Sequence, residues 1–117
     1  MHTQIYLAVT VVTIAINAAI AVADSVKAKF VLANSAAVDV PPSWLPLLAT
    51  LKGAGAAGLL LGLLGFRILG IAAAIGLTLF YVGAVVAHIR ARVLGNIAFP
   101  GAFLAFAVAS AVLAFLH

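Results

Sequence analysis

The sequence predicts an all-α fold, a transmembrane four-helix bundle, and three observations support this prediction. Hydrophobic residues make up 68% of the 117 residues, whereas a soluble domain has about 45–50%. Charged residues make up 7%, against about 25% in a soluble domain. The few charges also leave runs as long as the roughly 20 residues that a helix needs to cross hydrocarbon. The chain is therefore expected to form a single domain, residues 1–117, within the lipid bilayer.

The same composition argues against several functional classes. A chain this poor in polar residues cannot cover the surface of a soluble enzyme, and its composition is the opposite of a disordered segment. The net charge of +4 does not indicate nucleic acid, because the basic residues flank apolar runs, as in membrane proteins. The absence of cysteine excludes disulfides and thiolate chemistry. The His and Asp residues form no metal-binding pattern, so no metal is expected.

The first span is expected at residues 4–23, because the run 1–23 carries no charge. Within it, Ala21-Val22-Ala23 also resembles a signal-peptidase site. A signal peptide begins with Lys or Arg and has a shorter apolar run. The start Met1-His2-Thr3-Gln4 has no Lys or Arg, so a retained span is the favoured interpretation.

The second span is expected at residues 44–66. Pro41 and Pro42 end any helix that precedes them, and Ser43 is a suitable cap for the next helix. The charge-free run 53–66 is too short to cross hydrocarbon alone. The span must therefore contain Lys52.

The third and fourth spans are expected at residues 68–88 and 97–116. The turn at 65–67 is so short that the second and third helices must be antiparallel neighbours. Gly95-Asn96 breaks the chain before the last span.

The positions of the basic residues predict the orientation. Lys27 and Lys29 follow the first span, and Arg90 and Arg92 follow the third, whereas Arg67 stands alone at the opposite side. Because Lys and Arg collect in cytoplasmic loops, the two basic loops are expected in the cytoplasm. Both termini are then expected outside.

Small residues predict where helices approach closely, because within lipid only small side chains allow it. Gly58 and Gly62 form a G-x-x-x-G pair that is compatible with packing inside the bundle or with a homo-oligomer. Residues expected to continue this close packing are Ala72, Gly76, Gly101, Ala105 and Ala109. The glycines at 53, 55 and 58 are also expected to leave space for a pocket beside Lys52.

Five polar residues are candidate ligand-binding residues: Asn17, Asp24, Lys52, Tyr81 and His88. Ionisable groups at membrane depth are costly and mark functional sites, and three spans would bring these five into one half of the bundle. Lys52 is expected to be buried in the bundle and hydrogen-bonded to Asp24 or Asn17. A structural interpretation stays open, in which Lys52 pairs with Asp24 or extends to the interface. The spacing predicts no catalytic triad and no phosphate loop.

Three stretches of the sequence resemble the DoxX-like membrane family. They are Lys27-Ala28-Lys29-Phe30, the segment from Pro42-Ser43-Trp44 through Leu51-Lys52-Gly53-Ala54-Gly55, and Gly83-Ala84-Val85-Val86-Ala87-His88. The resemblance covers nearly the whole chain. It implies a multi-pass protein of a bacterial, more narrowly actinobacterial, inner membrane. It also implies that Lys52 and His88 occupy recurrent polar positions of the family.

The resemblance implies less about chemistry. Some relatives in the wider group are quinone-reducing subunits or members of membrane oxidoreductase complexes, and most DoxX-like proteins have no assigned activity. The first hypothesis is therefore a polar pocket for a lipid-soluble small molecule, with quinone as a candidate cofactor and an oxidoreductase as a candidate partner. The rival is a non-catalytic subunit or assembly partner with purely structural polar residues. A transporter is less favoured, because no inverted repeat is visible.

Overall fold

The computed structural model of the protein describes residues 2–95 and 97–116. It contains the long helices α1 (His2–Ser25), α3 (Leu45–Leu63), α4 (Arg67–Arg90) and α5 (Ala98–Leu116). Within the described residues, these four are long and apolar enough to cross a membrane. The predicted all-α transmembrane bundle is confirmed, and the helix ends differ from the predicted spans by a few residues. Asn96, half of the predicted break before the last span, lies outside the described residues.

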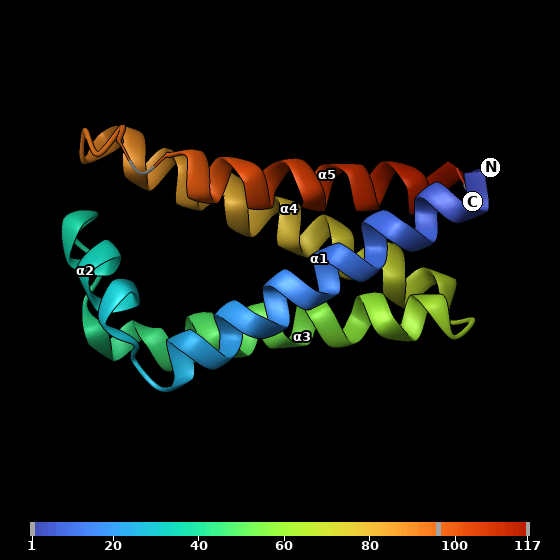
Figure 1. Ribbon diagram of the computed structural model, residues 1–117, viewed down its shortest axis with the longest axis horizontal. Helices are drawn as coiled ribbons and strands as arrows, with labels where there is room; N and C mark the ends of the chain where they lie inside the picture. The colour runs from blue at the N-terminus through green and yellow to red at the C-terminus, as the bar shows by residue number, and fades with distance from the viewer. Residues whose placement is uncertain (1, 96, 117) are drawn as a thin grey trace.

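The four long helices form a ring. α1 packs against α3 and α5, α3 packs against α4, and α4 packs against α5 (Figure 1). Leu64 to Phe66 form the short turn between α3 and α4, and Gly65 there has a left-handed φ of 116° that suits glycine. The N-terminal end of α1 and the C-terminal end of α5 lie at one end of the bundle, and α2 (Lys29–Ala37) lies at the other.

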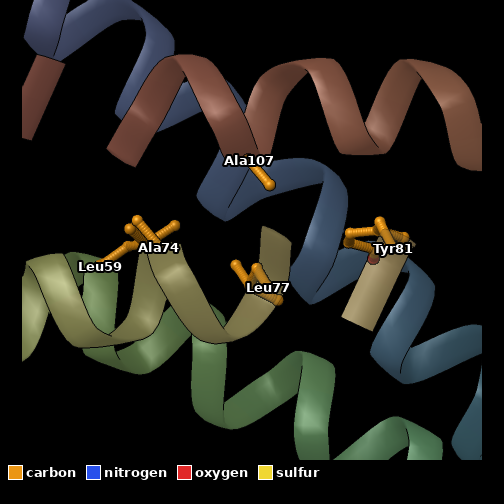
Figure 2. Close-up of a cluster of buried hydrophobic side chains, with 5 residues drawn as sticks. All are labelled: Leu59, Ala74, Leu77, Tyr81 and Ala107. Carbon is orange, nitrogen blue, oxygen red and sulfur yellow. The ribbon is translucent and has the colours of Figure 1, made fainter. Parts of the chain in front are cut away.

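Each long helix turns a stripe of buried residues toward the interior, and in α1 the spacings alternate between three and four residues. The buried stripe of α1 consists of Thr10, Thr13, Asn17, Ile20 and Asp24. This spacing is typical of left-handed helix packing. Figure 2 shows the apolar part of the interior, with side chains from α3, α4 and α5: Leu59, Ala74, Leu77, Tyr81 and Ala107.

Glycines bring α3 and α4 into close contact at the end away from α2. A Cβ atom added at Gly62 would lie 2.7 Å from the Cα of Gly70, and one at Gly58 would lie 2.6 Å from the Cβ of Ala73. The G-x-x-x-G pair therefore packs inside the bundle. The expectation of close packing is wrong for Gly76 and Gly101, because an added Cβ at either glycine would have no atom of another helix within 4 Å.

The segment between α1 and α3 contains two elements that the sequence did not predict, α2 and the 3₁₀-helix η1 (Pro42–Trp44). α2 has nine residues, too few for a clear periodic signal. Lys27 before it and Asp39 after it have left-handed φ angles of 50° and 62° that turn the chain. The expectation for Ser43 is wrong, because it lies inside η1 and no side chain caps α3.

Candidate functional site

A cavity of about 590 Å³ lies at the α2 end of the bundle. There the pair α4–α5 and the pair α1–α3 diverge, and α2 lies between them (Figure 1). All of the described helices and η1 contribute to its wall. The polar residues of the wall are Asp24, Asn34, Ser35, Lys52, Tyr81 and His88. Four of the five predicted site residues therefore face one cavity.

Lys52 and Asp24 form an ion pair in the cavity wall. The Lys52 Nζ donates to Asp24 Oδ2 at 2.8 Å, and the two side chains are 12% and 3% exposed. Lys52 occupies the interior stripe of α3, one turn after the buried Ala49. The Lys52 Nζ also lies 5.4 Å from the ring centroid of Phe80, within the range of a cation–π contact. Of the two predicted partners of Lys52, Asp24 is confirmed, whereas Asn17 bonds Tyr81 instead.

Tyr81 and Asn17 form a second buried pair. The Tyr81 hydroxyl donates to Asn17 Oδ1 at 2.6 Å, and Asn17 Nδ2 donates to the Thr13 carbonyl at 2.8 Å. Tyr81 lines the cavity, whereas Asn17 lies behind it and does not. Asn17 therefore acts on the cavity by fixing the position of the Tyr81 hydroxyl.

His88 connects α4 to α2. Its Nδ1 lies 2.8 Å from the Ala84 carbonyl oxygen, and its Nε2 lies 3.2 Å from Asn34 Oδ1. A carbonyl only accepts, so Nδ1 carries a proton. The second contact then fits a cationic ring facing Oδ1, or a neutral ring facing the NH₂ of a rotated Asn34 amide. Either arrangement fixes α2 over the cavity.

Sequence reasoning missed two groups of polar residues. Asn34 and Ser35 lie on α2, in a segment that the sequence predicts as a loop. Thr13 and Ser110 join α1 to α5 with an Oγ1–Oγ distance of 2.8 Å. For Thr13 a signal exists, because it lies three residues after Thr10 and four before Asn17 on the buried stripe.

The glycines do not make the cavity, contrary to the prediction. An added Cβ at Gly55 would lie 2.5 Å from Leu77 Cδ2, and the face of Gly58 is occupied by Ala73. Both glycines therefore pack against α4 rather than clear space beside Lys52. The space arises where the helix pairs diverge.

Aromatic side chains are concentrated at the cavity. Half of the ten Phe, Trp and Tyr residues line it, namely Phe30, Trp44, Phe80, Tyr81 and Phe99. The Tyr81 ring meets Phe80 edge-on at 5.0 Å between centroids. Phe103 lies behind the wall, 5.3 Å from Tyr81 and stacked on Phe99 at 5.0 Å. The wall thus offers ring faces to a flat ligand beside a few hydrogen-bonding groups.

Residues 8–110 match the DoxX-like family. The chain belongs to the DoxX-like family. No curated protein and no solved structure matches it. The match includes every predicted site residue, from Asn17 to His88. This DoxX-like protein is therefore a small multi-pass integral membrane protein whose cavity lies within the matched region.

The charges and hydrogen-bond donors of the cavity set its chemical character. The Lys52–Asp24 pair carries no net charge, and one of the three donor positions of Lys52 is used by Asp24. Among the side chains that the structure describes, no three of His, Asp or Glu group together as metal ligands. The arrangement suits a molecule with an uncharged, hydrogen-bond-accepting headgroup.

Proposed function

We propose that this protein binds a lipid-soluble small molecule with a polar headgroup in the cavity beneath α2, in a bacterial inner membrane. One observation carries the proposal: the Lys52–Asp24 ion pair lines a cavity whose wall is otherwise largely apolar and aromatic. Ionisable side chains at membrane depth are costly and occur mainly at functional sites. The cavity volume of about 590 Å³ also lies in the range of small-molecule sites, about 300–1,000 Å³.

A quinone is the candidate that these groups suit best. A quinone carbonyl would accept a hydrogen bond from Lys52, whose amine has donor positions beyond the one that Asp24 occupies. The flat ring would lie against Phe80 or Tyr81. His88, also in the wall, would exchange a proton with the reduced ring through a ring nitrogen. A redox role would also require a partner oxidoreductase in the same membrane.

The proposal places the cavity at the cytoplasmic end. Lys27, Lys29, Arg90 and Arg92 are exposed at the α2 end, whereas Arg67 lies at the opposite end and donates to the Phe115 carbonyl at 2.9 Å. The excess of basic residues at the α2 end supports a cytoplasmic location for it, with both termini outside. A reporter fused after the last residue is expected to be periplasmic, and a cytoplasmic signal would contradict this orientation.

A second function is favoured by a different observation. Each polar pair at the cavity is already satisfied inside the protein: Lys52 with Asp24, Tyr81 with Asn17, and His88 with Asn34. Such mutual pairing is what a non-catalytic subunit or assembly partner would need to hold its helices together. In that case the cavity would have no ligand of its own.

Fluorescence of Trp44 separates the two functions, because it is the single tryptophan and lines the cavity. We expect decylubiquinone to quench the purified protein in detergent saturably. The double variant Lys52→Met/Asp24→Asn removes both charges together and should bind more weakly. Thr78→Val is the matched control, because the Thr78 hydroxyl bonds only its own helix at Ala74 and lies outside the cavity wall.

Quenching that rises linearly with quinone and is the same in all variants would contradict the binding proposal. It would report only quinone dissolved in the micelle, since the Trp44 side chain is 55% exposed. Mass spectrometry of small molecules retained after gentle purification checks the result without an added ligand. The wild type should retain a molecule that the double variant loses.

A further inference from the structure

The exposed and buried parts of the cavity wall differ in polarity. The exposed residues of the wall are all apolar: Phe30, Ala33, Trp44, Gly83 and Phe99. The polar residues are buried or half-buried, with Asp24 and His88 only 2% and 3% exposed. A cavity that opened to water would carry polar groups at its mouth. This cavity has the opposite arrangement, which suits an opening toward lipid.

Gly83 marks a gap in the wall. It lies on an exposed face of α4 and lines the cavity, and no atom lies within 4 Å of an added Cβ there. It precedes the end of α4 at Arg90 by seven residues, or roughly 10 Å at 1.5 Å per residue. This depth places Gly83 below the membrane surface, where its exposed face meets hydrocarbon.

Gly76 provides a built-in comparison. It lies seven residues before Gly83, on the same face of α4. It is also exposed, and an added Cβ there would also contact nothing within 4 Å. Gly76, however, does not belong to the cavity wall. The two glycines therefore differ in their relation to the cavity and not in their exposure.

We infer that the cavity opens sideways into the bilayer at Gly83, and that its occupant is a neutral amphiphile whose headgroup lies inside while its apolar tail stays in the lipid. The inference rests on the proposed binding function and adds the route and the ligand class. A neutral headgroup follows from the Lys52–Asp24 pair, whose charges cancel, because a charged headgroup would lie unpaired in an apolar wall. The apolar mouth accounts for the tail.

A single-thiol reporter tests the route without any ligand. The chain has no cysteine, and Ser35 lies in the cavity wall on α2, 6% exposed. Ser35→Cys therefore places one thiol inside with little change in shape. The full-length variant in phosphatidylcholine vesicles is treated with N-phenylmaleimide, which dissolves in lipid, or with a sulfonated maleimide, which does not. Each rate is divided by that of Val26→Cys, whose site is 69% exposed in the turn after α1.

We expect the normalised alkylation rate of Ser35→Cys to be several-fold higher with the lipid-soluble reagent than with the sulfonated one. Adding Gly83→Leu should slow it several-fold, and Gly76→Leu should leave it unchanged. If the leucine variant does not fold, Gly83→Ala adds a smaller side chain at the opening. It should slow the lipid-soluble reagent less than a leucine would. Equal normalised rates for the two reagents, or a rate that no substitution at Gly83 changes, would overturn the lateral opening. Because labelling requires no ligand, this result is independent of the quinone titration.

Discussion

The two ends of the α3–α4 pair are built in opposite ways. At the end away from α2, Gly62 and Gly70 bring the two backbones into direct contact. At the α2 end, Lys52 of α3 and Phe80 of α4 extend into the space between the diverging helices, with the Lys52 Nζ 5.4 Å from the Phe80 ring centroid. One pair of helices therefore combines a dry, tightly packed contact with a cavity.

The difference shows where a small membrane protein can hold polar groups. The tight end gains its stability from packing, which needs small residues rather than charges. The cavity end buries a carboxylate, an ammonium and an imidazole, each of which needs a partner in lipid. If this contrast is correct, substitutions at the two ends should destabilise the protein for different physical reasons. Four experiments test this expectation.

The largest effect is expected from Lys52→Met at the cavity end. It leaves the Asp24 carboxylate, 3% exposed, without its partner. Removing one member of a buried ion pair costs about 3–5 kcal/mol. We expect a loss of this order in the free energy of unfolding, measured by thermal or denaturant unfolding in detergent.

The companion variant Lys52→Met/Asp24→Asn should recover most of that stability, because both charges are then gone. If the single variant is as stable as the wild type, the pair does not contribute to the fold, and a ligand-facing role for Lys52 alone gains support. A double variant that stays as unstable as the single one would show that the loss comes from packing.

At the tight end, Gly62→Ala should be destabilising for a steric reason. The added Cβ would lie 2.7 Å from a backbone atom of Gly70, which cannot move without separating the helices. Overpacking of this kind costs about 1–3 kcal/mol. Gly76→Ala is the matched control and should be neutral or slightly stabilising, because it adds helix propensity on an open face. Equal unfolding midpoints for the two variants would contradict the close contact.

Much of this architecture could be predicted from the sequence. Charge-free runs locate three of the four spans, and the prolines at 41 and 42 together with the short run after Lys52 locate the second. Placing Asp24 at the end of one span and Lys52 inside the next makes their ion pair predictable. Lipid-facing and interior side chains are both apolar, however, so hydropathy does not show which face of each helix points inward. The three-and-four spacing of Thr10, Thr13 and Asn17 does show it for α1.

The cavity could not be predicted in the same way. It depends on the divergence of helix pairs and on α2, a short helix that contacts His88 through Asn34. Neither leaves a periodic pattern in the sequence. The glycines near Lys52 predict space at the depth where the cavity lies. They do not create that space, however, because α4 occupies the faces of Gly55 and Gly58.

A smaller effect is expected from Tyr81→Phe, at the inner limit of the cavity. It removes the hydroxyl that donates to Asn17 Oδ1 at 2.6 Å. Hydrogen bonds between membrane helices contribute about 0.6 kcal/mol on average and up to about 1.7. A double-mutant cycle with Asn17→Ala, followed by unfolding in detergent, should give a coupling of about 1 kcal/mol, because both residues are buried. Additive effects would mean that the two side chains do not interact.

The smallest effect should come from Asn34→Ala, which removes the hydrogen bond between α2 and His88. The contact is long, at 3.2 Å, and a single hydrogen bond contributes about 0.5–1.5 kcal/mol. We expect the unfolding midpoint of the spans to stay unchanged, while amide hydrogen exchange in α2 and trypsin cleavage at Lys29 become several-fold faster. Thr50→Ala removes a bond within its own helix on an exposed face of α3 and should leave α2 protected. If Asn34→Ala leaves α2 equally protected, the packing of Val31 against Ile20 and Leu45 holds the helix in place, and His88 is not its anchor.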